Sequence, residues 1–145
     1  MNDQSFGNLK DWGGVLEKLE ALAMAGKLGD HQDELIRLLR YNDNWRLREA
    51  ALGALPRIQA PSPALIDEAL AIMMCDDLYH DVRILAADAL GKTLRKKAKA
   101  GSRGHDKAGE PVGKVLDGMN RLLNDPQPPI LHKAVQASLE KIVNG

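Results

Sequence analysis

The sequence predicts an all-α protein, built as an α-solenoid of antiparallel helix pairs. Ala and Leu dominate the composition while aromatic residues make up only 3%, a balance typical of closely packed helices. Apolar residues also recur at the spacing of one buried helical face. Finally, LREAALGAL (47–55) is followed 35 residues later by the similar VRILAADAL (82–90). A repeat of this length made of helices is typical of a solenoid, in which each unit buries its apolar face against its neighbour.

The repeated stretches predict three equivalent helices. Their apolar positions follow the offsets i, i+3, i+4, i+7, i+8 and i+11, which lie on one face of a helix. The stripes are Leu47, Ala50, Ala51, Ala54, Leu55 and Ile58 in the first copy, Val82, Leu85, Ala86, Ala89, Leu90 and Thr93 in the second, and Leu131, Ala134, Val135, Ser138, Leu139 and Ile142 in the third. Three matches at the same offsets indicate a true internal repeat.

Each predicted helix is preceded by another one, so that the repeating unit is a helix pair. The stretches 35–47, 70–82 and 119–131 align on the same offsets, and each passes through a polar turn of Asn, Asp or Pro that can cap the following helix. The pattern as a whole predicts helices over 9–25, 31–41, 44–56, 62–75, 79–99, 111–124 and 128–143.

The chain is predicted to form a single domain over residues 1–145. An N-terminal half-repeat carries Trp12, Val15, Leu16, Leu19, Leu22 and Ala23 at helical spacing. We place the half-repeat at 9–28, the three repeats at 30–58, 62–98 and 111–143, and a glycine-rich insertion at 99–110.

Composition narrows the functional class. The N-terminus has no signal-peptide pattern and no long apolar run occurs, so we expect a cytoplasmic protein with no membrane partner. Cys75 is the only cysteine, which excludes an internal disulfide. The four histidines, His31, His80, His105 and His132, lack the helical spacing of a metal site, and we expect neither a metal nor a cofactor.

The repeat resembles the HEAT repeat, in particular the short bacterial and archaeal form shared with phycobiliprotein lyases. The resemblance is carried by a leucine or methionine pair, an acidic turn, a Val-Arg or Leu-Arg pair and an Ala-rich helix, best seen from Met73 to Gly91. It implies a right-handed α-solenoid of three HEAT-like repeats plus the N-terminal half-repeat. It also implies a structural ladder in which Arg48 and Arg83 bond the acidic turns at Asp43, Asp76, Asp77 and Asp81, with His132 in place of the third arginine and a weaker last rung.

The face opposite the buried stripes is the predicted binding surface for another protein. In a solenoid this face of the second helices forms one concave ridge, here with Trp45, Glu49, His80, Ile84, Asp88 and Lys133. Trp45 and Ile84 are apolar where solvent-facing residues are expected, and a large aromatic is a frequent interface anchor. The alternative for Trp45 is a packing role at the start of its helix. The main prediction is therefore a non-catalytic scaffold or adaptor that binds protein.

A basic segment provides an alternative site. Residues 92–107 carry seven cations against Asp106 alone, namely Lys92, Arg95, Lys96, Lys97, Lys99, Arg103 and Lys107. Contact with nucleic acid or an acidic partner is one interpretation, and a solvated surface is the other. No aromatic is interleaved with these charges, which disfavours binding of single-stranded nucleic acid.

Two further hypotheses concern catalysis and self-association. The resemblance to the phycobiliprotein-lyase form of the repeat implies a bilin lyase or a chaperone of phycobiliproteins as an alternative function. A separate catalytic possibility is Cys75 with His80, the only local pairing of a nucleophile and a base in the sequence. We expect no catalysis, because no further residue supports such a pair. The open ends of a solenoid could also pair two copies, with Trp12, Val15 and Leu16 as an apolar cap.

Overall fold

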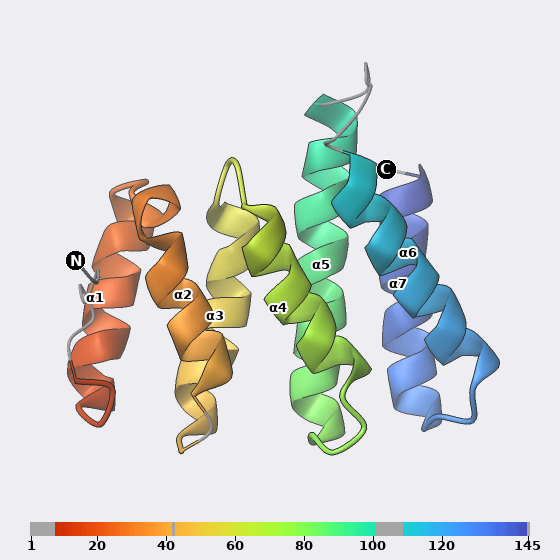
Figure 1. Cartoon of the computed structure of the whole chain (residues 1–145), viewed down its shortest axis with the longest axis horizontal. Helices are drawn as coiled ribbons and strands as arrows, with labels where there is room; N and C mark the ends of the chain where they lie inside the picture. Colours follow the sequence, from red (N-terminus) through yellow and green to blue (C-terminus); the bar gives the residue numbers. More distant parts are fainter. Residues whose placement is uncertain (1–7, 42, 101–108, 145) are drawn as a thin grey trace. The chain divides into compact units, whose positions relative to one another are not determined.

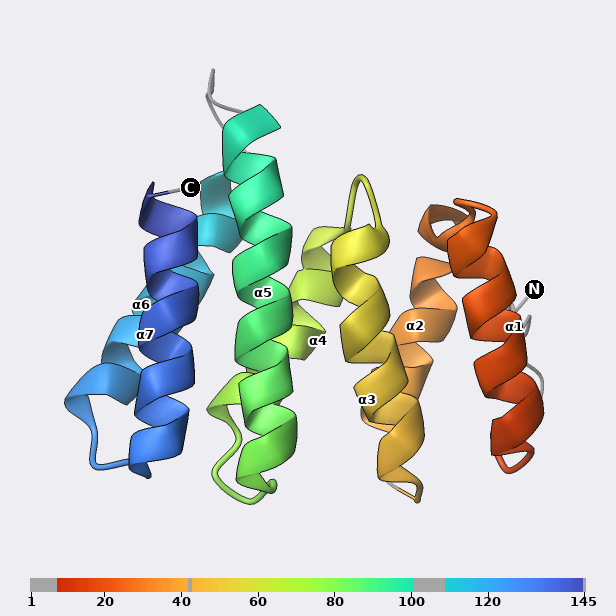
Figure 2. The same ribbon diagram turned by 180° about the vertical axis from the view of Figure 1, so that it is seen from behind.

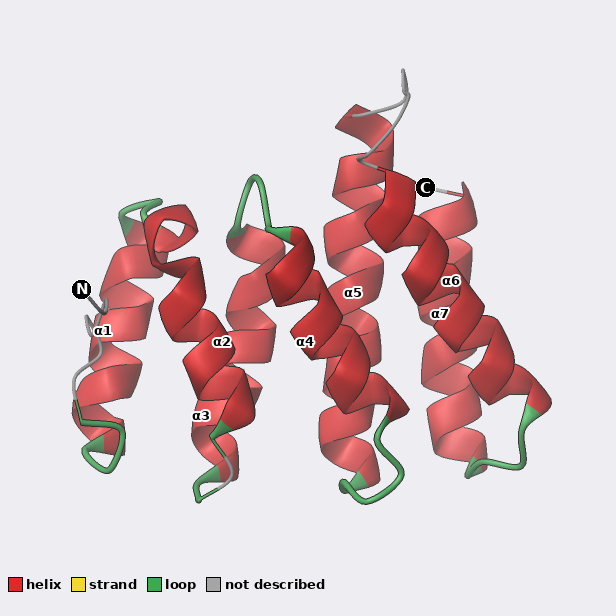
Figure 3. Cartoon of the chain, in the orientation of Figure 1, coloured by secondary structure: helices red, strands yellow, loops and turns green. Residues whose placement is uncertain are grey.

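The structure is a computed structural model that describes residues 8–41, 43–100 and 109–144, and within these residues every regular element is helical (Figure 3). The α-helices are α1 (Trp12–Met24), α2 (Gln32–Arg40), α3 (Trp45–Ala54), α4 (Pro63–Met74), α5 (His80–Ala100), α6 (Gly109–Asn124) and α7 (Pro129–Asn144). Two 3₁₀ turns, η1 (Leu28–His31) and η2 (Leu55–Arg57), were not predicted. The all-α class and the seven predicted helices are confirmed for the described residues.

The contacts of the chain gather in two compact units, Met1–Glu68 and Ala69–Gly145, and the division falls within α4. In the first unit α1 and α3 lie side by side and run in the same direction; the antiparallel α2 lies in front of them in Figure 1 and behind them in Figure 2. In the second unit α5 and α7 lie side by side, and α6 lies behind them (Figure 2). Within each unit, the second helices therefore share one layer.

Helix α1 begins and ends with local signals. The Asp11 carboxylate accepts a hydrogen bond from the Gly14 amide at 3.4 Å and caps the N-terminus. At the other end Gly26 adopts a φ of 71°, its amide bonds the Ala23 carbonyl, and the Lys27 amide bonds the Leu22 carbonyl. This pattern is a Schellman motif, for which glycine has no steric penalty.

Helix α3 is shorter than the predicted range of 44–56. The Asn44 side chain accepts from the Arg46 amide at 2.9 Å and sets the start at Trp45. Pro56 has no amide hydrogen to continue the helical bonds, so the chain tightens into η2 and is extended at Ile58. Ile58 is still buried, although it lies outside the helix on which it was predicted.

Side chains tie the segment after η2 to the start of α2. The Gln32 amide nitrogen donates to the carbonyls of Gly29 and Ala60, and its oxygen accepts from the Ser62 amide at 2.6 Å. Ser62 in turn caps α4 through the Leu65 amide. These bonds satisfy backbone groups that no helix serves.

Close helix contacts define the core of the second unit. Gly91 of α5 faces Ser138 of α7, where an added Cβ would lie 2.9 Å from the Ser138 Cβ. Gly118 of α6 similarly approaches Leu70 and Met74 of α4. Small residues therefore permit backbones to approach where a larger side chain would not fit.

The predicted apolar stripes are largely buried, with two differences. Trp12, placed on the buried face of the half-repeat, is 44% exposed, because it is the first residue of α1 and its ring lies beside Arg46. Leu52 and Ala87, outside the stripes, are fully buried. A helix covered on two sides buries a wider arc than its strongest apolar stripe. Among the described residues, no helix has the length and the apolar character needed to cross a membrane.

Candidate binding site between helices α1 and α3

Both tryptophans of the chain lie beside one arginine. Trp12 begins α1 and Trp45 begins α3, and the parallel direction of the two helices brings these N-termini to the same end of the first unit (Figure 2). The guanidinium carbon of Arg46 lies 5.6 Å from the centroid of the Trp12 ring and 5.5 Å from that of Trp45. Each contact is within the range of a cation–π interaction, worth about 0.5–1 kcal/mol at an exposed site. Trp45 is 59% exposed, so that the cluster is open to solvent.

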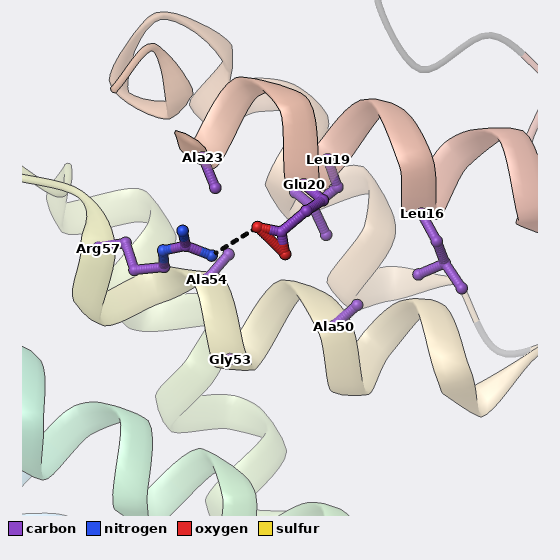
Figure 4. Close-up of a pocket in the computed structure, with 8 residues that line it drawn as sticks. All are labelled: Leu16, Leu19, Glu20, Ala23, Ala50, Gly53, Ala54 and Arg57. Atoms are coloured by element: carbon purple, nitrogen blue, oxygen red, sulfur yellow. Dashed lines mark hydrogen bonds and ion pairs between the residues drawn. The ribbon is translucent and has the colours of Figure 1, made fainter. Parts of the chain in front are cut away.

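A groove of about 330 Å³ lies between α1 and α3. Its lining consists of apolar and small side chains with one acid and one base, as Figure 4 shows: Leu16, Leu19, Glu20, Ala23, Ala50, Gly53, Ala54 and Arg57. Leu16 follows Trp12 by one turn, and Ala50 follows Arg46 by one turn. Helical geometry therefore places the tryptophan cluster and the groove on the same faces of the two helices.

An ion pair spans the other end of the groove. Glu20 of α1 and Arg57 of η2 are 3.2 Å apart and link the C-terminal ends of the two helices (Figure 4). Beyond Arg57 lies a second, more polar hollow of about 490 Å³, lined in part by Asp30, Gln32 and Gln59. Both side chains of the pair are exposed, so we expect the pair to contribute little to the free energy of unfolding.

The two arginines at and beside the groove, Arg57 and Arg46, differ in whether a carboxylate is paired with them. Arg57 and Glu20 neutralise one another, whereas Arg46 has no carboxylate within 4.0 Å in the described part of the chain. On the outer face of α2, a hydrogen bond from Arg40 to Glu68 and the charge of that carboxylate raise the pKa of Arg40. Arg46, one turn before the groove lining at Ala50, is therefore the nearby cation whose hydrogen-bond donors remain available to a partner.

The predicted concave ridge is only partly exposed. Trp45 and Glu49 in the first unit, and His80 and Lys133 in the second, are exposed. Ile84 and Asp88 are half-buried, so Ile84 is not the solvent-facing anchor that its helical position suggested. Helix α5 packs along α7, and the strip of α5 left to solvent is correspondingly narrow.

The arginines assigned to a ladder bond backbone carbonyls. Arg83 is 1% exposed; its Nε donates to the Met73 carbonyl at 2.9 Å and its Nη1 donates to Gln127 at 3.3 Å. Its Nη2 forms the predicted ion pair with Asp76 at 3.3 Å, although the two groups do not have hydrogen-bond geometry. Asp81 is exposed and forms no ion pair or hydrogen bond in the described residues, so that it is not a rung with Arg83.

The equivalent positions in the other repeats make similar bonds. The Nε of Arg48 donates to the Leu39 carbonyl at 2.9 Å. The Nε2 of His132 lies 2.8 Å from the Leu122 carbonyl and 2.9 Å from that of Asp125. Both partners are acceptors, so Nε2 carries the proton. Arg48, Arg83 and His132 are each the fourth residue of their helix, and each bonds a backbone carbonyl at the end of the preceding helix. The predicted ladder had placed carboxylates of the acidic turns in the position of these carbonyls.

The basic segment is described only at its start. Lys92 and Arg95 are exposed on α5. The side chains of the other cations assigned to this site lie outside the described residues: Lys96, Lys97, Lys99, Arg103 and Lys107. The basic site therefore stays a prediction from the sequence.

The structure places Cys75 and His80, the predicted local pairing of a nucleophile and a base, at the end of α4 and the start of α5. Cys75 is half-buried and His80 is exposed, and neither forms a hydrogen bond with the other. No three His, Cys, Asp or Glu side chains among the described residues are placed to hold a metal ion. Val15, assigned to an apolar end cap, is buried in the core, which leaves Trp12 and Leu16 for such a role.

Two contacts were missed from the sequence. Trp12 was assigned to the core, and Arg46 was not singled out, although Trp45-Arg46 stands next to the predicted helix start. Glu34 of α2 is buried and both of its carboxylate oxygens lie 2.9 Å from Nη1 of Arg37. The signal for Glu34 was its position one turn before Leu38, which places it on the apolar face.

Comparison of the chain with protein-family models, with curated proteins and with solved structures gave no match.

Proposed function

We propose that this chain is a HEAT-like α-solenoid that acts without catalysis, in the cytoplasm, by binding another protein. The observation that carries the proposal is the exposed cluster of Trp12, Arg46 and Trp45, which lies one helical turn before the α1–α3 groove. Tryptophan and arginine are the residues most enriched among the energetically dominant contacts of protein interfaces. An exposed pair of indoles also removes apolar area from water when a partner covers it.

The repeated carbonyl bonds support the solenoid part of the proposal. Arg48, Arg83 and His132 occupy one repeat position and each fixes the second helix of its pair to the end of the first. The same bond recurs in three helix pairs, as the repetition of one structural unit requires. Fold alone does not define function, so the binding role rests on the tryptophan cluster.

Capture from a lysate of the native host tests this role. The full chain is immobilised as wild type, Trp45→Ala, Arg46→Ala and Tyr79→Ala; Tyr79 is 86% exposed in the second unit and serves as the matched aromatic control. We expect wild type and Tyr79→Ala to retain the same protein, and both cluster variants to lose it with an unchanged melting temperature. Equal capture by all four proteins would contradict the assigned surface.

The nucleic-acid alternative predicts a different result in the same assay. Lys92→Glu with Arg95→Glu would then abolish capture, nuclease treatment would release the bound material, and binding would fall steeply with salt. Under our proposal these changes leave capture intact, because neither residue contributes to the cluster.

A further inference from the structure

We infer that the partner element, on the proposed protein-binding function, is an amphipathic helix that carries a carboxylate in its last turn. In this arrangement the helix lies in the α1–α3 groove, antiparallel to both helices, with the carboxylate on Arg46. The inference names the partner's chemistry and its orientation, which the binding role alone does not.

The dimensions of the site suit a helix of about three turns. On α1 the groove lining runs from Leu16 to Ala23, and Trp12 lies one turn before it. The surface from Trp12 to Ala23 therefore extends over eleven residue steps, or about 16 Å at the helical rise. The α3 side presents Ala50, Gly53 and Ala54, whose small side chains admit a third helix at close range. A Cβ built on Gly53 meets no atom within 4 Å, so that the space above this position is open.

The lining favours an apolar stripe on the partner. Leu16, Leu19 and Ala23 form the α1 side, and the only charged side chains of the lining are Glu20 and Arg57, which are paired with each other. A partner that presents apolar residues at i, i+3 or i+4 and i+7 would cover this surface without burying an unpaired charge.

The charge of Arg46 favours a carboxylate on the partner helix, and the helix dipoles of α1 and α3 favour one direction of that helix. The Arg46 guanidinium contacts two indole rings and has no carboxylate partner in the described residues. A guanidinium held in this way loses less rotamer freedom when it binds an oxyanion. The N-termini of α1 and α3 carry partial positive charge at the same end, which attracts the negative C-terminus of an incoming helix. An acidic residue in the partner's last turn satisfies both features.

The test uses helix-stapled peptides of about 14 residues, long enough to cover the groove and held helical because short helices are marginal in water. One peptide has an apolar stripe and Glu in its last turn, the second has Lys there, and the third has its Glu in the first turn. The chain contains two tryptophans, both in the cluster, so intrinsic fluorescence reports this site. We expect the first peptide to bind at least about tenfold more tightly than the other two.

Groove filling and charge exchange provide the decisive variants. Gly53→Leu fills the groove and should weaken the first peptide at least about tenfold, whereas Gly113→Leu, an equally unobstructed glycine on α6, should not. Arg46→Glu should reverse the preference in favour of the Lys peptide. Circular dichroism on each variant verifies the fold.

Three outcomes would overturn the inference: equal binding of all three peptides, no effect of Gly53→Leu, or displacement of the peptide by a single-stranded oligonucleotide that quenches the tryptophans in its place. If lysate capture still depends on Trp45 while the peptides fail, the binding role stands and the helical partner is wrong. If peptide binding succeeds but capture is unaffected by the cluster variants, the site binds helices and the proposed role of that surface in the cell is wrong.

Discussion

The Nε atom of Arg83 donates a 2.9 Å hydrogen bond to the carbonyl oxygen of Met73, so that a charged side chain of α5 closes the end of α4. The guanidinium is almost fully buried and also reaches Gln127 in the turn before α7. The side chain thus joins its own helix to the preceding helix and to a turn 44 residues further along the chain. A buried guanidinium is tolerated here because two of its nitrogens donate hydrogen bonds and the third is paired with the Asp76 carboxylate.

Arg83→Ala should lower the free energy of unfolding by about 2–3 kcal/mol, the upper range for a lost hydrogen bond to a charged group. Arg83→Met keeps most of the side-chain volume but no donor, and should recover only the packing part of this loss. Chemical denaturation of both variants measures the difference. An unchanged midpoint in Arg83→Ala would show that the bonds to Met73 and Gln127 contribute no stability.

Gly91 and Gly53 should respond in opposite ways to the same substitution. Gly91→Ala places a methyl group 2.9 Å from the Ser138 Cβ and 3.1 Å from its Cα, so α5 and α7 must separate and stability should fall by about 1–3 kcal/mol. Gly53→Ala meets open space in a helix interior and should raise stability by about 0.5–1 kcal/mol. Thermal melts of the pair decide this. Stabilisation by both changes would rule out the close approach at Ser138.

The two ion-paired arginines of α2 should contribute unequally. Arg37 pairs with Glu34, whose side chain is 3% exposed, whereas Arg40 pairs with Glu68, whose side chain is 21% exposed. Arg37→Ala removes a charged partner from a buried carboxylate and should cost about 1–3 kcal/mol, since that group cannot return to water. Arg40→Ala should cost less, because solvent screens its pair. Equal losses in urea denaturation would contradict this ranking.

Thr93→Val should leave the fold unchanged or stabilise it by up to about 1 kcal/mol. The Thr93 hydroxyl is buried on α5 and has no hydrogen-bond partner among the residues that the structure describes, and valine has nearly the same shape without a polar atom to desolvate. Thr93→Ser is the control, since it keeps the hydroxyl and loses the methyl group, and should destabilise the protein. A clear loss of stability in Thr93→Val would reveal that the hydroxyl has a partner, such as a bound water.

The repeat and the helix pattern were sufficient to predict the seven α-helices, though not the two 3₁₀ turns, because helical periodicity and capping are local properties. The stripe from Val82 to Thr93 predicted α5, and the polar residues around Asn44 predicted the start of α3 to within one residue. Pro56 and Gly26 carried the signals for the ends of α3 and α1 through the loss of an amide donor and the tolerance of positive φ.

Only the tertiary structure decided which side chains meet between elements. Trp12 and Arg46 are 34 positions apart, and their contact depends on the parallel packing of α1 and α3 rather than on either helix alone. Ile84 is half-buried for a comparable reason, because its exposure is decided by how closely neighbouring helices approach α5. Periodicity reports the average direction of a helix face, whereas burial and contact depend on the distance between helices, and that distance is set by side chains far away in the sequence, such as Gly91 opposite Ser138.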